Sequence, residues 1–175
     1  GPPGSTSVAS ITTEDVEVIE EVRGADIVIG RLLRAARLEF KDDVNYGYLV
    51  SMPEDEKRDL AEDAFNLELE DGRLLKDGDG KKIVIGADYA DASVFEREVH
   101  VGDSVKVQGE DFDVVGILEK KGSFTVDGAI LMNTDPMREL LDEPDEVDII
   151  AVQVEDVDEI ERVAADIERK LRKHR

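Results

Sequence analysis

The sequence predicts an α+β fold with two subdomains, one built from both ends of the chain and the other inserted between them. A helix pattern followed by a strand pattern opens the chain, and a strand pattern followed by a helix pattern closes it. Between them lie turn-rich segments with the period-two alternation of β-hairpins. We therefore expect a discontinuous α+β subdomain from residues 5–50 and 135–175, with an inserted β-rich subdomain over residues 51–134.

The length and composition of the chain favour a folded protein. Its 175 residues, 41% of them hydrophobic, can supply a core for one domain or two small subdomains. There is no cysteine, which excludes disulfides and thiolate zinc sites, and no apolar run approaches the roughly 20 residues of a membrane span. The first four residues, Gly-Pro-Pro-Gly, are predicted to be a tag remnant.

The charge of the chain is strongly negative. It holds 44 acidic and 22 basic residues, for a net charge of -22. Residues 161–175 carry a net charge of +3, so the remainder of the chain carries -25. Because such a surface repels phosphate groups, nucleic-acid binding by the main body is disfavoured.

The first helix is predicted over residues 13–23. Thr12 or Thr13 can cap it, acidic residues in its first turn complement its positive end, and Gly24 is placed to end it. Residues 26–29 then have the pattern of a buried strand.

The next segment is ambiguous. Leu, Ala and Arg favour a helix over residues 30–40, whereas their position before the polar residues 41–45 favours the first arm of a hairpin. Residues 46–52 would be the returning arm. A helix is predicted from Pro53 to Phe65, because Pro and acidic residues suit a first helical turn.

The stretch from Gly72 to Leu131 carries the clearest strand signals. After a turn at residues 71–73 come a strand at 82–85, a glycine break and a small helix. A polar turn then starts a hairpin, whose own turn is predicted at residues 109–111. Apolar side chains alternate along this hairpin, as expected where one face is buried.

The chain closes with strands, helices and a basic tail. Strands are predicted at residues 128–132 and 147–154, with a helix at 135–141 and an acidic linker after it. The final helix begins near Asp156 and ends in basic residues that complement its negative end. Its apolar residues repeat at a/d spacing: Val157, Ile160, Ala164, Ile167 and Leu171.

Several separate segments between residues 72 and 119 occur in an order typical of one family. They read GRLL, IVIGADYADASVF and VHVGDSVKVQGEDFDVVGILE. In pattern and order they resemble the MacB-like periplasmic core domain, the extracytoplasmic insert of FtsX-like ABC transporter permeases. The resemblance implies a discontinuous α/β porter-like subdomain with a β-rich insert, and it favours a strand over residues 30–40.

The resemblance also implies a function. The chain would be the extracytoplasmic domain of a permease in the cell membrane, with one membrane helix before residue 5 and another after Arg175. It would bind a cargo or partner and transmit ATP-driven motion, with no chemistry or cofactor of its own. The expected partners are the membrane-embedded remainder of the permease and a cytoplasmic subunit that holds the ATP. The basic tail would then lie next to the membrane.

The residues alone leave two other functions open. One is a secreted soluble binding or adhesion module, and the other is a hydrolase that uses surface carboxylates. An apolar groove without convergent titrating groups would indicate binding, whereas a deep pocket with perturbed carboxylates would indicate an enzyme.

Two motifs have weak chemical signals. The segment Asp77-Gly78-Asp79-Gly80 resembles the start of a calcium loop, but the twelfth position is Asp88 rather than Glu, so a plain turn is predicted. His100 lies near serines in the sequence, namely Ser93, Ser104 and Ser123, yet none of them sits in a G-x-S-x-G elbow. We predict no catalytic, cofactor-binding or metal-binding residue.

The aromatic residues are mostly predicted to form the core. This group comprises Tyr46, Tyr48, Phe65, Phe95 and Phe112. Phe124 differs, because it lies in a loop next to glycine and is therefore the candidate partner contact.

Overall fold

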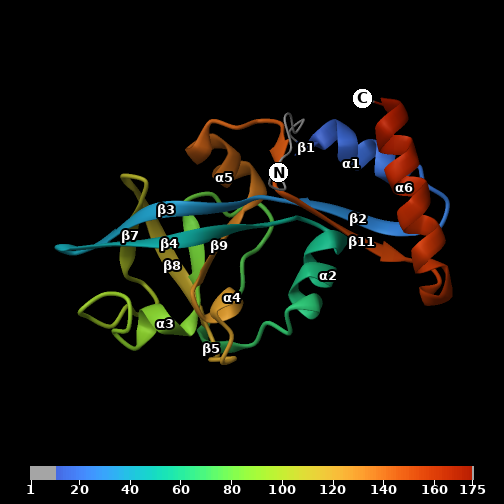
Figure 1. The fold of residues 1–175 in the computed structure, drawn as a ribbon. Coiled ribbons are helices and arrows are strands. Elements are labelled where there is room, and N and C mark those ends of the chain that lie inside the picture. The colour runs from blue at the N-terminus through green and yellow to red at the C-terminus, as the bar shows by residue number, and fades with distance from the viewer. Residues whose placement is uncertain (1–10, 175) are drawn as a thin grey trace, which may run out of the picture. The chain divides into compact units, whose positions relative to one another are not determined.

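The computed structural model describes residues 11–174, which fall into two compact units. The first unit holds both ends of the described chain, up to Leu32 and from Glu143, and the second runs from Leu33 to Asp142. Figure 1 shows the order of the elements. The structure is mixed α+β, as the sequence predicts. The tag remnant expected at residues 1–4 lies outside the described residues.

The unit boundaries differ from the expected residues 51 and 134. Strands β3 (Leu33–Phe40) and β4 (Asp43–Met52) and helix α5 (Thr134–Leu141) belong to the inserted unit. The reason is strand pairing, because β4 lies parallel to β9 (Ala129–Asn133) and α5 packs on these same two strands. Distant pairing partners therefore set the boundary, and sequence order does not reveal them.

The first unit joins the two chain ends through a pair of antiparallel strands. Val28 and Val152 are cross-strand partners in it. A Cβ on Gly30 would lie 2.9 Å from the Val16 side chain, so glycine lets the first helix approach the strands closely. The elements are β1 (Ile11–Thr12), α1 (Thr13–Glu20), β2 (Ala25–Arg31), β10 (Glu146–Val147), β11 (Ile149–Val154), the 3-10 turn η1 (Val157–Glu159) and α6 (Ile160–His174).

The apolar stripe predicted for the final helix is partly wrong. Val163 is the buried residue of α6, whereas Val157 is 73% exposed and Ala164 is also exposed. The prediction assumed one α-helix from residue 157 onward, but the segment begins as the 3-10 turn η1. A 3-10 helix has three residues per turn rather than 3.6, which moves Val157 off the face that it would share with α6 in one continuous α-helix. Within α6 the buried face is centred on Val163, one position before Ala164.

The second unit is built on a seven-stranded sheet in the order β5-β8-β6-β9-β4-β3-β7. An additional pairing of β7 with β8 closes six of these strands into a ring. The strands not yet bounded are β5 (Leu69–Gly72), β6 (Lys82–Ile85), β7 (Ser104–Val107) and β8 (Glu110–Leu118). Ring closure means that the sheet has an inner and an outer face.

The inner face of the ring is the main core. Cross-strand partners on it are buried together, as in the pairs Leu38–Val107 and Ile83–Val114. Phe95 closes one side, with its ring centroid 5.7 Å from that of Phe40. The predicted core positions of Phe95 and Phe112 are confirmed, since both are buried.

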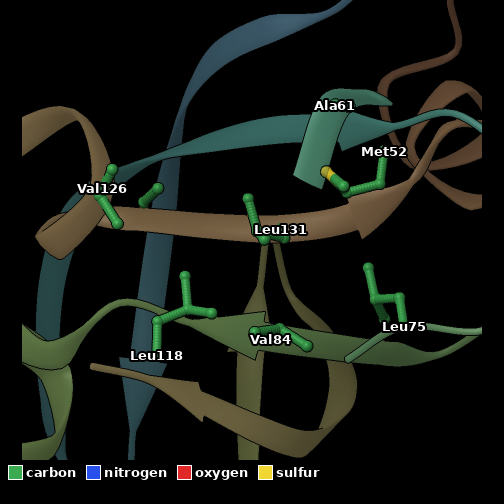
Figure 2. Close-up of a cluster of buried hydrophobic side chains, with 8 residues drawn as sticks. Met52, Ala61, Leu75, Val84, Leu118, Val126 and Leu131 are labelled. Carbon is green, nitrogen blue, oxygen red and sulfur yellow. The ribbon is translucent and has the colours of Figure 1, made fainter. Parts of the chain in front are cut away.

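A second apolar cluster lies on the outer face of the ring. Helices α2 (Glu56–Ala64) and α4 (Phe124–Asp127) each contribute one side chain to it, Ala61 and Val126. Figure 2 shows these side chains converging with those of the strands and the loop. The other buried members are Met52, Leu75, Val84, Leu118, Ala129 and Leu131. The cluster covers β4, β9 and β6, but not the first half of β4.

Two predicted turns are displaced. The hairpin turn is formed by Gln108 and Gly109, with φ of 50° and 83°, and Glu110 already pairs with Val107 in β8. A two-residue turn of this kind needs positive φ at both positions, which matches the strand twist. The turn expected at residues 71–73 begins within strand β5, whose Gly72 pairs with Gly116.

None of the helices in residues 11–174 is long and apolar enough to cross a membrane.

Candidate functional site

The outer face of the β3–β4 hairpin carries exposed apolar side chains. Alternate residues of a strand share a face, so Val44, Tyr46 and Tyr48 of β4 lie on one side of the sheet. Their partners on β3 include Ala35 opposite Tyr48. We name this region the aromatic surface and define it by six residues, Leu33, Ala35, Val44, Tyr46, Tyr48 and Phe124.

The exposure of this surface is unusual for aromatic side chains. Tyr46 is 70% exposed and Phe124 is 71% exposed. The same outer face is buried further along β4, where Met52 belongs to the cluster that also holds Ala61 of α2. No described element covers the first half of the hairpin in the same way. Contiguous exposed apolar side chains of this kind mark interaction sites.

Phe124 is exposed but held in place. Its ring centroid lies 5.4 Å from that of Tyr48, and the Tyr48 hydroxyl donates to the Phe124 backbone oxygen at 2.9 Å. A Cβ on Gly128 would lie 2.7 Å from the Phe124 ring, so only glycine allows the ring to rest there. The side chain therefore has a fixed position before any ligand arrives.

Asp127 fixes the loop that leads to Phe124. Its carboxylate is buried and accepts from the backbone N–H groups of Lys121 and Gly122, at 2.8 and 2.9 Å. Burial raises the pKa of the Tyr48 hydroxyl, and the nearby Asp127 charge raises it further. Tyr48 thus stays neutral and keeps its donor at physiological pH. A surface fixed in this way loses little conformational entropy on binding.

The charged groups at the border of the aromatic surface are paired with one another. Arg37 forms an ion pair with Glu39, its neighbour on the outer face of β3. The Lys121 ammonium lies 2.7 Å from Glu68, on the side of Phe124. The surface itself therefore presents apolar and aromatic groups without an unpaired charge at these positions.

The structure corrects the predicted core positions of two aromatic residues. Tyr46 and Phe65 were expected to be buried, but they are 70% and 45% exposed. Tyr48 is only half-buried. Sequence reasoning missed Leu33, Ala35 and Val44 as surface residues. The available signal was the alternation of Val44, Tyr46 and Tyr48 with smaller residues, which identifies one face without showing whether anything covers it.

The other sequence motifs form structural contacts. The Asp79 carboxylate accepts from Arg73 at 2.9 Å and from the Lys76 backbone N–H at 2.8 Å, and these bonds hold the turn. His100 lies on the surface, 3.7 Å from Glu98 and 3.6 Å from Asp103. Within residues 11–174, no group of three or more His, Asp or Glu side chains is arranged to hold a metal ion.

Two of the three serines near His100 in the sequence, Ser93 and Ser123, bond elsewhere. Ser93 donates to Asp91, and the Ser123 hydroxyl lies 2.6 Å from that of Thr125. The basic end of α6 pairs with acids in α1 and directly after it, with His174 3.3 Å from Glu14 and Lys170 3.3 Å from Glu21.

Comparison with known proteins points to one family. Residues 1–170 match the family described as the MacB-like periplasmic core domain. An uncharacterised ABC transporter permease of Methanocaldococcus jannaschii is 30% identical over 163 residues, which cover 93% of this chain and 40% of that protein. The chain thus spans less than half the length of this relative.

Solved structures share the fold. The extracellular domain of the ABC-type transporter YknZ from Gram-positive bacteria superposes with a TM-score of 0.75 at 19% identity, covering 96% of this chain and 86% of that one. The periplasmic region of MacB from Actinobacillus actinomycetemcomitans gives 0.72 at 15% identity, covering 97% and 77%. At these identities the likeness is one of fold.

Proposed function

The chain belongs to the family of MacB-like periplasmic core domains, the extracytoplasmic domains of ABC transporter permeases, and from this premise we propose that it receives a cargo or partner protein at the aromatic surface. The observation that best supports this proposal concerns Phe124. Its side chain is 71% exposed, yet it is fixed by Tyr48 and by the loop that Asp127 anchors. An exposed aromatic side chain with a fixed position is well suited to binding.

We propose that the full-length protein is a permease in the cell membrane. Both ends of the described chain lie in the first unit, so membrane helices joined to them would act on that unit. The chain enters the inserted unit between Leu32 and Leu33 and leaves it between Asp142 and Glu143. These two connections would carry motion, driven by ATP on a cytoplasmic subunit, to the aromatic surface. The domain itself would perform no covalent chemistry.

The location of the domain can be tested by labelling in intact cells. This chain has no cysteine, so Phe124→Cys in the full-length permease provides a single reactive thiol in the domain. We expect a membrane-impermeant maleimide added outside to label it. Val163→Cys is the control, because that side chain is 1% exposed and should stay unlabelled. Labelling of Phe124→Cys only after the membrane is broken would refute the extracytoplasmic location.

The parent gene provides a second test. Reading about 40 codons beyond each end should reveal an apolar span of roughly 20 residues on both sides. Polar sequence or a stop codon directly after Arg175 would instead favour a secreted soluble binding module. The aromatic surface would serve binding in that protein as well.

A further inference from the structure

We propose that the occupant of the aromatic surface is a cationic amphipathic segment of a polypeptide. This inference rests on the proposed binding role of the surface and adds the chemistry of its ligand. Three features of the second unit support it: its net charge, the pairing of charges at the border of the surface, and the exposed faces of two aromatic rings.

The net charge of the second unit favours a cationic ligand. Residues 33–142 include 27 acidic and 14 basic side chains, a net charge of -13. The densest part is residues 54–71, with nine acidic and two basic side chains. A field of this sign concentrates cations near the surface and speeds their association. It repels a second copy of the chain, which carries -22, and it repels anionic lipid.

The ion pairs at the border of the aromatic surface limit where the negative charge of the second unit acts on a ligand. Arg37 pairs with Glu39, and Lys106 lies 3.1 Å from Asp111 on the neighbouring strands. Since these charges already have partners, the attraction comes from the wider field and not from contacts at the surface. We therefore expect salt to slow the association of the ligand much more than it speeds dissociation.

The apolar part of the ligand would supply most of the contact. Tyr46 and Phe124 offer exposed ring faces, against which aliphatic side chains can pack. A Lys or Arg side chain above the same rings gains a cation–π interaction. From Val44 to Tyr48 the strand rises about 13 Å, a length that about two turns of an amphipathic helix can match.

Synthetic peptides test this inference on the isolated chain. The probe is a labelled peptide of about 14 residues, with Leu at helical spacing and Lys elsewhere, compared with two analogues that carry Gln or Glu in place of Lys. We expect the Lys peptide to bind about tenfold more tightly than the Gln peptide, with no binding of the Glu peptide. Raising salt from about 20 to about 200 mM should lower the association rate about tenfold and change the dissociation rate less than about twofold.

Variants locate the binding site. We expect the double variant Tyr46→Ser and Phe124→Ser to weaken Lys-peptide binding about tenfold or more. Phe65→Ser is the matched control, because Phe65 is exposed but lies outside the aromatic surface, and it should bind as the parent chain does. Both variants change exposed side chains, so circular dichroism should show unaltered folding for each.

Several outcomes would overturn the inference. Undiminished binding of the Lys peptide to the double variant would show that the peptide binds elsewhere. Equal binding of the Gln and Lys peptides would show that the charge of the ligand does not contribute to affinity. No binding of any peptide would also reject it. Self-association in sedimentation, or flotation with phosphatidylglycerol vesicles, that the double variant abolishes would assign the surface to another occupant. The maleimide labelling is independent of all these results, so the proposed location can fail or hold separately.

Discussion

Two hairpins of the same closed sheet differ on their outer faces. On the inner face, β3 and β7–β8 both carry buried apolar side chains, and Leu38 of β3 is the buried partner of Val107 of β7. On the outer face, the β7–β8 hairpin has Ser104, Lys106, Asp111 and Asp113, all exposed. Strand β4 of the β3–β4 hairpin has Val44 and Tyr46 in equivalent exposed positions, opposite Glu39 and Arg37 of β3.

The difference between the outer faces of the two hairpins shows which side chains the fold requires to be apolar and which it does not. Closing the ring requires apolar residues on the inner face of both hairpins, because that face is removed from water. The β7–β8 hairpin shows that a polar outer face is compatible with the same closure. The exposed apolar side chains of Val44 and Tyr46 on the outer face of β4 are therefore not needed for ring closure, which supports a role in binding.

The largest expected effect on stability comes from a substitution on the inner face of the ring, to which both hairpins contribute. Leu38→Ala removes a fully buried side chain between β3 and β7 and should lower the free energy of unfolding by about 2–5 kcal/mol. Urea denaturation followed by circular dichroism measures it. Leu33→Ala is the control on the outer face of the same strand, where the residue is exposed. Similar losses for the two variants would contradict the assignment of inner and outer faces.

The second effect tests what holds Phe124 in place. Asp127→Ala removes the acceptor of the Lys121 and Gly122 N–H groups and should cost about 1–3 kcal/mol, because those donors lose their partner. Amide exchange should also quicken at residues 121–124. Asp113→Ala, an exposed carboxylate on the outer face of β8, is the matched control and should change little. A loop that exchanges as slowly as in the parent chain would show that Asp127 does not fix it.

The sequence predicts much of the order of helices and strands, but not which parts of the outer face of the sheet are covered by helices. Strand β6 was predicted at the residues where it occurs, because its β-branched run is bounded by glycine and charged residues. Propensity alone left β3 open between helix and strand, since its Leu, Ala and Arg favour helix, and the family resemblance favoured the strand that the structure shows. The local sequence pattern therefore predicts where helices and strands lie. Residue propensity gives the wrong element where pairing with a distant strand determines the structure.

The candidate site was only partly predictable for the same reason. Phe124 could be singled out because it follows Gly122 in a segment predicted to be a loop, although the structure begins the short helix α4 at this residue. Tyr46 could not, because period-two alternation shows that a face is apolar but not whether a helix covers it. That depends on where α2 and α4 pack, which is set by residues far apart in the sequence that join one cluster, such as Met52, Ala61 and Val126.

A smaller effect concerns the hydroxyl of Tyr48. Tyr48→Phe removes the hydrogen bond to the Phe124 oxygen and should cost about 0.5–1.5 kcal/mol at neutral pH. The pKa of Tyr48 is raised in the folded state, so the folded chain holds the proton more tightly than the unfolded chain does. Stability should therefore be full below the unfolded pKa of about 10 and fall as pH rises above it.

The Tyr48→Phe variant should show a shallower alkaline decline than the parent chain. The pKa of buried Tyr89 is raised too, so part of the decline must persist in the variant. Denaturation midpoints measured from about pH 8 to about pH 11 would show both components. An identical pH dependence in parent and variant would mean that Tyr48 titrates alike in the folded and unfolded chains.

The smallest effect on stability is also the sharpest test of the comparison. Tyr46→Thr gives this position of β4 a polar side chain like those on the outer face of β7–β8, and Thr, like Tyr, is favoured in strands. Because Tyr46 is 70% exposed, the free energy of unfolding should change by less than about 0.5 kcal/mol. Binding of the Lys peptide should nevertheless weaken several-fold. A chain that loses stability as well as binding would show that the aromatic face belongs to the fold, and the contrast between the hairpins would then lose its functional meaning.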